Sequence, residues 1–454
     1  MSHYFFAHRA LLPQGWRHNV TIEVDEHGFL QKLTPDTQQE HSQLLHGAVI
    51  PAMCNLHSHA FQRVMAGLAE VAKNPHDSFW SWRQLMYQML ETLTPEAVGA
   101  IATQLYIDML KGGYTQVAEF HYLHHDTDGK PYQDDAMLQQ LMIAAHSSGI
   151  GQTLLPVLYS YAGFGCQPPL PTQKRFIQQT DAWLGQQERL DGWIQKQPLI
   201  NRGICFHSLR AVSKTQMREA LILSSIDLPV HIHISEQLKE VAESQAWSGQ
   251  RPVNWLFDHF DVNQRWCLIH ATHLDDRELN RLAGSGAVAG LCPTTEANLG
   301  DGIFRGTDYL AQNGRWGIGS DSQVSLDVVE ELRWFEYSQR LRDHRRNCLT
   351  RQGEPSVGDT LYKQACQGGA QTCGVAVGTL SAGYRADWLV LEEDALLGPV
   401  PDSQLINRWL FAGNRAHIRD VFVAGRQVID QGQHRDQLQA AHAFSSVVKR
   451  LLSE

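Results

Sequence analysis

Two histidines separated by one residue, His57 and His59, stand in the stretch PAMCNLHSHAF at residues 51–61. The residues before them, 47–56, form a nearly continuous apolar run, which is typical of a strand buried on both faces. Residues two apart on an extended chain point to the same side, so both imidazoles are expected to converge at the end of this strand. Such convergence is what a metal site needs. The alternative is two unrelated polar residues in a loop.

Several apolar segments further along the chain also end in residues that can bind a metal, a proton or an anion. They are Glu119, His121 and Tyr122; His207 and Arg210; His233 and Glu236; His270 and His273; and Asp321. In a barrel of parallel strands, the active site is built from residues at the carboxyl ends of the strands. A series of His and Asp residues at these places is hard to explain by structure alone.

The elements that must position these residues are apolar strands alternating with amphipathic helices. Strands are expected within residues 47–56, 115–121, 152–161, 201–210, 229–235, 265–273, 287–293 and 315–322. Eight strands joined by right-handed helical crossovers predict an α/β fold of the (β/α)8 TIM-like barrel type. An open doubly wound sheet is the alternative, but no Gly-rich phosphate loop follows the first strand.

Capping signals locate some of the helices between these strands. Thr94 and Pro95 open a helix that is expected to run to Lys111 and to stop at two glycines. Ser213 and Gln216 form a capping box that opens another helix. Further helices are expected near residues 134–148, 172–188 and 326–340.

The two ends of the chain have a different pattern. Residues 3–46 contain short strands with a hairpin turn at His27-Gly28, and strands return without long helices after about residue 378, with a tight turn at Ala424-Gly425. These ends are predicted to pair into one small β-sandwich domain. The expected division is 1–50 for its first part, 51–377 for the barrel, and 378–454 for its second part with a final helix near 434–452.

Composition limits the partners. The chain has 454 residues and a formal net charge of -10, which argues against nucleic acid because phosphate binding needs clustered Lys and Arg. The amino terminus lacks the pattern of a signal peptide, and no stretch approaches the length of a membrane span. Eight scattered cysteines without a C-x-x-C pair indicate reduced thiols, so a cytoplasmic protein with no membrane partner is expected.

Four motifs resemble the amidohydrolase superfamily over nearly the whole chain: H-x-H after the first strand, HIHISE after the fifth, LIHATH after the sixth and GIGSDS after the eighth. No Lys ends the fourth strand, where binuclear members carry a bridging carboxylated Lys. Glu236, three residues after His233, instead resembles the H-x-x-E of the mononuclear deaminases.

The resemblance implies one divalent metal per chain, Zn2+ or Fe2+, with the family's ligands at His57, His59, His233 and Asp321. His231 is a rival ligand on the same strand face as His233, but the H-x-x-E spacing favours His233 and leaves His231 as a supporting or core residue. By the same resemblance, the catalytic residues are Glu236, His270 and Asp321. His270 and Asp321 orient a water molecule and take its proton, and Glu236 delivers a proton to the leaving nitrogen.

The segments CNLHSHAFQRVMAG, SFWSWRQLMY and AEFHYLHH resemble the branch of the superfamily that acts on N-formimino-L-glutamate in bacterial histidine degradation. That resemblance implies hydrolysis to N-formyl-L-glutamate and ammonia, a homodimer, and a pocket for a small dicarboxylate. The matching substrate-binding residues are Gln62, Arg83, Tyr122, His207 and Arg210. Arginine suits this role because its planar guanidinium binds carboxylates in a bidentate way.

Two alternatives remain open from the sequence. One is an aminohydrolase of a purine or triazine ring that uses the same machinery, and the other is a non-catalytic barrel that serves as a binding module. No particular role follows from the sequence for six further polar residues near the strand ends. They are Glu119, His121, His124 and His125 at the end of the second strand, and Ser322 and Gln323, whose place beside Asp321 would allow contact with the substrate but does not establish it.

Overall fold

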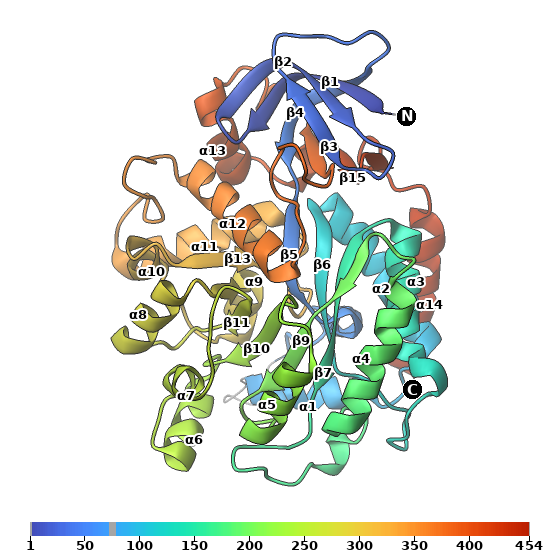
Figure 1. The fold of residues 1–454 in the computed structure, drawn as a ribbon, viewed down its shortest axis with the longest axis vertical. Helices are drawn as coiled ribbons and strands as arrows, with labels where there is room; N and C mark the ends of the chain where they lie inside the picture. The colour runs from blue at the N-terminus through green and yellow to red at the C-terminus, as the bar shows by residue number, and fades with distance from the viewer. Residues whose placement is uncertain (1, 72–78, 454) are drawn as a thin grey trace.

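The computed structural model describes residues 2–71 and 79–453, and it has a barrel part and a smaller part, each built on its own sheet (Figure 1). Ser78, the first residue of the SFWSWRQLMY segment, lies outside the described residues. Among the described residues, no helix combines the length and apolar character that crossing a membrane requires.

The barrel sheet is entirely parallel and runs in the order β13-β12-β11-β10-β9-β7-β6-β5, with the short β8 beside β7. Its strands are β5 (Met53–Ser58), β6 (Tyr114–His121), β7 (Gly151–Leu158), β8 (Ile200–Arg202), β9 (Ile204–Ser208), β10 (Val230–Ile234), β11 (Trp266–His270), β12 (Val288–Leu291) and β13 (Arg315–Ile318). The first and last strands meet where the His57 carbonyl accepts from the Ser320 and Asp321 amides at 3.1 and 3.0 Å. This arrangement confirms the predicted (β/α)8 barrel.

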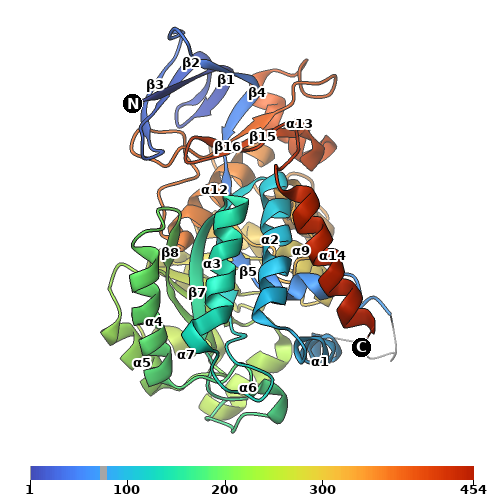
Figure 2. The ribbon, with the colours of Figure 1, turned by 90° about the vertical axis from the view of Figure 1, so that its right-hand side faces the viewer.

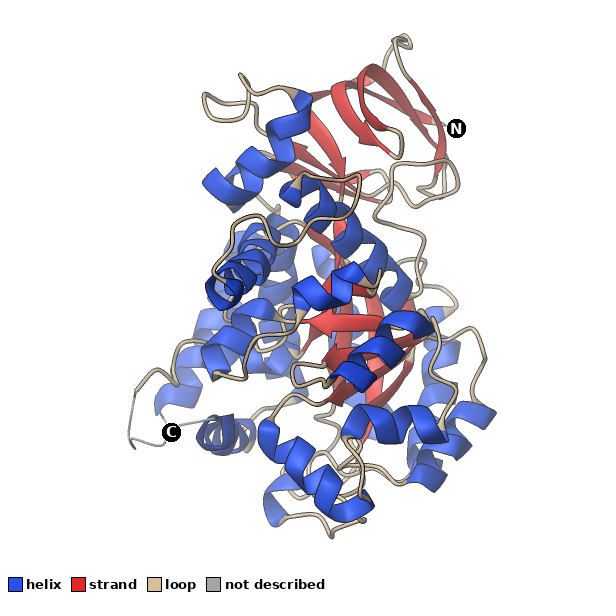
Figure 3. Ribbon diagram, turned by 90° about the vertical axis from the view of Figure 1, so that its left-hand side faces the viewer, coloured by secondary structure: helices blue, strands red, loops and turns tan. Residues whose placement is uncertain are grey.

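Helices surround the barrel strands (Figure 3). They are α1 (Phe79–Leu90), α2 (Pro95–Lys111), α3 (Ala136–Ser148), α4 (Thr180–Ile194), α5 (Lys214–Leu223), α6 (Leu238–Ser248), α7 (Pro252–His259), α8 (Asp276–Ser285), α9 (Pro293–Leu299), α10 (Gly306–Ala311), α11 (Val328–Asp343) and α12 (Val357–Cys373). The predicted bounds of α2 are confirmed, and the Thr94 hydroxyl accepts from the Ala97 amide at 3.3 Å. The predicted capping box of Ser213 and Gln216 opens α5. Helix α4 begins at Thr180, later than the predicted residue 172.

The smaller sheet combines both ends of the chain in the order β16-β15-β14-β4-β1-β2-β3. Its strands are β1 (His3–Leu12), β2 (Gly15–Val24), β3 (Leu30–Thr34), β4 (Gln43–Pro51), β14 (Trp388–Leu391), β15 (Ile418–Val423) and β16 (Arg426–Ile429). Phe5 from the first end packs edge-on against Trp388 and Phe422 from the second, with ring centroids 5.0 and 5.6 Å apart. Both predicted hairpins, β2-β3 and β15-β16, are present.

Three features differ from the sequence predictions. The apolar run 47–56 is not one strand, because its first half belongs to β4 of the smaller sheet and its second half to β5 of the barrel, with a break at Ala52. Residues Asp402–Ala412 form a helix, α13, where no long helix was expected. The final helix, α14 (Gln437–Ser453), lies beside α2 of the barrel rather than on the smaller sheet, and Lys111 Nζ donates to Gln437 Oε1 at 2.8 Å (Figure 2).

Candidate active site

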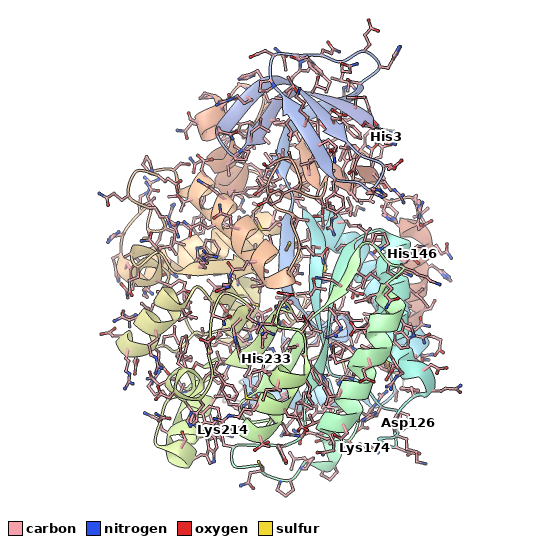
Figure 4. The ribbon with its side chains drawn as sticks, in the orientation of Figure 1. His3, Asp126, His146, Lys174, Lys214 and His233 are labelled. Carbon is pink, nitrogen blue, oxygen red and sulfur yellow. The ribbon has the colours of Figure 1, made fainter. Side chains whose placement is uncertain are left out.

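Four side chains from three barrel strands converge at the carboxyl end of the barrel. His57 and His59 come from the end of β5, His233 comes from β10, and Asp321 follows β13. One ligand atom from each lies within 4.8 Å of the others, and all four residues are buried. Figure 4 labels His233 on the barrel part of the molecule. The sequence therefore predicted a set of residues that the fold brings together.

The orientation of the imidazoles fits a shared cation. His59 Nδ1 lies 2.7 Å from the Phe120 carbonyl and His233 Nδ1 lies 2.9 Å from the His207 carbonyl, so each ring is placed to donate there and to present Nε2 inward. His57 Nε2 and His233 Nε2 are 3.0 Å apart, and Asp321 Oδ1 lies 3.3 Å from the Nε2 atoms of His57 and His59. Facing nitrogen lone pairs beside a carboxylate are stabilised by a divalent metal. The four residues therefore form a candidate site for a divalent metal.

A second group of ionisable residues adjoins the cluster. His270 Nε2 lies 3.8 Å from Asp321 Oδ2 and 3.7 Å from Glu236 Oε1, while His270 Nδ1 lies 3.3 Å from Glu296 Oε1. Burial raises the pKa of Glu236 to about 7. Burial alone would lower the pKa of His270, but the carboxylates of Glu236, Glu296 and Asp321 outweigh it and raise that pKa to about 10. Proton transfer at neutral pH needs groups with shifted pKa values of this kind.

A pocket opens onto this cluster. All five predicted substrate-binding residues line it: Gln62, Arg83, Tyr122, His207 and Arg210. Gln62 Nε2 donates to the Tyr122 hydroxyl at 3.1 Å. Aromatic residues complete the wall, among them Trp82, Tyr87, Tyr159 and Phe176. The pocket thus combines a metal cluster at one side with two arginines at the other.

The two arginines have no ionic partner among the described residues. Among the described residues, the guanidiniums of Arg83 and Arg210 contact aromatic rings, and the buried Nε of Arg210 lacks a hydrogen-bond acceptor. Arg210 is only 8% exposed. Burial disfavours its charge, but the more distant carboxylates of Glu240 and Glu236 outweigh that effect and raise the pKa of Arg210. A buried guanidinium without an acceptor is costly, and an anionic ligand would stabilise it.

The three histidines at the second strand's end, together with the rival His231, donate to backbone carbonyls in the structure. The ring Nε2 atoms lie 2.8–2.9 Å from carbonyls as follows: His121 to Leu123, His124 to Val157, His125 to Ile177, and His231 to Thr372. These contacts link loops, strands and helices around the site. None of the four lines the pocket, and His231 lies outside the metal cluster.

The remaining polar residues support the loop that carries His57 and His59. Glu119 accepts from the Ala60 amide at 2.7 Å and from the hydroxyls of Ser58 and Tyr106 at 2.8 and 3.1 Å. Gln323 Nε2 donates to the Ser58 hydroxyl at 3.0 Å. Ser322 bonds to Thr295, with 3.0 Å between the hydroxyls. These contacts hold the loop that follows β5 against strand β6 and the segment after β13.

Sequence reasoning missed residues of two kinds. Glu296, on α9, was not considered because an acidic residue in the first turn of a helix is usually a capping group. Tyr159 and Tyr87 were also missed, although Tyr159 directly follows β7 and the position of polar residues after barrel strands could have identified it. Tyr87 lies on α1 outside the barrel strands, and no signal in the sequence marks it.

Comparisons with known proteins agree with this geometry. Residues 48–428 match the model of the amidohydrolase family. The chain is similar to formimidoylglutamate deiminase of Pseudomonas aeruginosa, with 56% identity over 449 residues that cover 98% of this chain and 99% of that protein. It is also similar to the solved structure of an amidohydrolase from Brucella melitensis, with a TM-score of 0.95, 43% identity and coverage of 99% of this chain and 100% of that one. An adenosine deaminase from Xanthomonas campestris, solved with bound zinc, shares the fold at a TM-score of 0.81 and 21% identity, over 99% of this chain and 98% of that chain.

Proposed function

The chain belongs to the amidohydrolase family, and from that membership and the site we propose that it hydrolyses N-formimino-L-glutamate to N-formyl-L-glutamate and ammonia. The observation that carries the choice of substrate is the pair of guanidiniums, Arg83 and Arg210, that line the pocket beside the metal cluster and have no ionic partner in the described part of the chain. A substrate with two carboxylates supplies one acceptor for each guanidinium. A neutral purine or triazine ring would leave both charges unpaired.

The side chains divide the reaction between them. His57, His59, His233 and Asp321 would hold a divalent metal, which when bound would activate a water molecule at neutral pH. His270 and Asp321 would orient that water by hydrogen bonds and take its proton as its oxygen bonds to the formimino carbon. Glu236, buried beside His270, would deliver a proton to the terminal nitrogen of the formimino group, so that the bond between carbon and this nitrogen breaks and ammonia leaves. Gln62 and Tyr122 bind the substrate beside this centre, and His207 lies on the arginine side.

Several finer statements belong to the same proposal. The three imidazoles and one carboxylate favour Zn2+, with Fe2+ as the alternative metal. The reaction is a step of histidine degradation in the cytoplasm, and the protein acts as a homodimer. A non-catalytic barrel would have no need for Glu236 and His270 beside the metal ligands.

Ammonia release tests the proposal. Metal-analysed enzyme is incubated with N-formimino-L-glutamate, with guanine and with N-carbamoyl-L-glutamate, and Glu236→Gln serves as the control that lacks the proton donor. We expect rapid release from the formimino compound alone and a kcat lower by about 10²–10⁴-fold in Glu236→Gln with unchanged metal content. Release from guanine alone, or none from any of the three by protein that holds one metal per chain, would refute the proposed substrate.

A further inference from the structure

Three cations from separate elements surround one indole ring, that of Trp80 on α1. The Arg83 Cζ lies 4.9 Å from the ring centroid and the Arg210 Cζ lies 5.8 Å from it. The Nζ atom of Lys239, on α6, lies 4.2 Å from the same centroid. Cations within about 6 Å of an aromatic centroid are attracted by the electron-rich face of the ring, and tryptophan attracts them best. Trp80 therefore contacts both arginines of the pocket at once.

The helical spacing of α1 explains how Arg83 is held. Residues three and four apart on a helix lie on the same face, so Trp80, Arg83 and Tyr87 are neighbours there. The Arg83 Cζ lies 5.4 Å from the Tyr87 ring in addition to its contact with Trp80. Two aromatic rings thus hold its guanidinium, and no carboxylate of the described residues pairs with it. An aromatic ring attracts the cation without occupying its N–H groups, so these can donate to a ligand.

Arg210 reaches the same ring from another part of the molecule. It follows β9 of the barrel, whereas α1 lies outside the barrel strands. The buried Nε of Arg210 has no hydrogen-bond acceptor among the described residues. The contact of its guanidinium with the Trp80 ring relates the position of Arg210 to that of Arg83.

We propose that Trp80 is a positioning residue that sets Arg83 and Arg210 at the separation needed for the two carboxylates of the substrate, and so determines selectivity for a dicarboxylate. The inference rests on the proposed function, because it assigns the two arginines to the two carboxylates. An aromatic ring suits this role since it attracts both guanidiniums without neutralising either charge. Its effect is on binding, and the metal cluster on the other side of the pocket is untouched.

The test compares two replacements of Trp80. Trp80→Leu removes the ring, and Trp80→Phe keeps a smaller one. Steady-state kinetics are measured with N-formimino-L-glutamate and with N-formiminoglycine, which has one carboxylate. Trp334→Leu on α11 is the matched control, because Trp334 is 43% exposed and does not line the pocket. Melting temperature and metal content are recorded for each protein.

We expect Trp80→Leu to raise KM for the dicarboxylate about tenfold, which corresponds to about 1.4 kcal/mol, with kcat little changed. The preference for the dicarboxylate over the monocarboxylate should fall by a similar factor. Trp80→Phe should have a KM close to that of the unaltered enzyme, and Trp334→Leu should have the same KM as the unaltered enzyme. A merely structural role would instead lower kcat for both substrates and lower the melting temperature.

Two results would overturn the inference. One is a KM in Trp80→Leu within twofold of the unaltered enzyme, and the other is an equal loss for both substrates. The proposed function fails separately, if the unaltered enzyme releases no ammonia from N-formimino-L-glutamate.

A double variant gives a further check. In the background of Arg83→Met, Trp80→Leu should raise KM by a smaller factor than it does in the unaltered enzyme, because one of the two guanidiniums that the ring positions is already absent.

Discussion

The two sides of the pocket are held in place by different physical means. On the metal side, His57, His59 and His233 come from barrel strands, and ring nitrogens of His59 and His233 contact backbone carbonyls. On the arginine side, Arg83 and Arg210 contact aromatic rings and no ionic partner among the described residues. From this contrast we infer that the barrel backbone holds the candidate metal ligands, while side-chain packing between α1 and the loop after β9 sets the positions of the two arginines that we propose bind the substrate. Changes on the two sides should have different kinetic signatures.

The largest effect is expected on the metal side. His233→Ala removes one of four ligands, so we expect loss of bound metal and no detectable ammonia release. His231→Ala is the matched control two residues away, since the His231 ring donates to the Thr372 carbonyl and not to the metal cluster. That control should retain metal and activity and should lose about 1–3 kcal/mol of unfolding free energy. If His231→Ala lost the metal and His233→Ala retained it, His231 and not His233 would be the ligand.

On the arginine side, Arg210→Met should change binding and leave the metal in place. Removing one partner of a buried ion pair typically costs about 2–5 kcal/mol, so we expect KM for N-formimino-L-glutamate to rise about a hundredfold or more with a smaller change in kcat. Arg210→Lys keeps the charge but loses the planar fork, and it should give an intermediate KM. Steady-state kinetics at constant metal content measure both. If kcat fell in Arg210→Met while KM stayed constant, the separation of the two sides would be wrong.

The same division explains how much of the site could be predicted from sequence. The candidate metal ligands and proton-transfer residues lie at or just after the ends of apolar strands, so His57, Glu236 and Asp321 can be identified from the order of the residues. Trp80 and Tyr87 lie on a helix outside the barrel, and their contacts depend on how that helix packs. Periodicity cannot reveal such a contact. Arg83 was identified only through resemblance to a family.

The fold shows a similar limit. Hydrophobic periodicity predicted eight parallel strands, and the helix caps at Thr94 and Ser213 predicted two helix starts. The run 47–56 has the composition of one buried strand, but it changes sheet at Ala52, and β4 there pairs with β14, a strand about 340 residues further along the chain. Helix α13 was missed although Leu405, Ile406, Trp409 and Leu410 have helical spacing and are buried. The sequence therefore contains the helical pattern that predicts α13.

A smaller effect is expected behind the metal site, at Glu296. Its Oε1 lies 3.3 Å from His270 Nδ1 and accepts from the Cys292 amide at 3.0 Å, so it orients the imidazole toward Asp321 and Glu236. Glu296→Gln keeps an acceptor for the amide but removes the charge beside His270. We expect kcat to fall about 10- to 100-fold at nearly constant KM, as when a residue that orients a catalytic group is changed. Glu331→Gln is the control, because Glu331 is equally buried but bonds to Thr294.

If Glu296→Gln had no effect on kcat beyond that of Glu331→Gln, the orientation of His270 would be set by the barrel alone. The metal side of the pocket would then need no support from side chains, which would sharpen its contrast with the arginine side. A rise in KM without a change in kcat would instead connect Glu296 to substrate binding and weaken that contrast.

The smallest effect concerns stability, at Glu119 beneath the loop that carries His57 and His59. Burial raises its pKa to about 7 from an ordinary value of 4.5. The folded protein therefore holds this proton at a pH where the unfolded chain has lost it. The contribution of this proton to the unfolding free energy is fully present below pH 4.5 and is lost as the pH rises through 7, by up to about 3 kcal/mol.

Glu119→Gln resembles the protonated carboxyl and removes this pH dependence. The unfolding free energy of the unaltered protein minus that of Glu119→Gln should therefore decrease between pH 5 and 8. Denaturant unfolding of both proteins over this range measures the difference. A constant difference would mean that the hydrogen bonds from Ser58, Ala60 and Tyr106 fully offset the burial of the charge, so that this side of the pocket holds a permanent carboxylate.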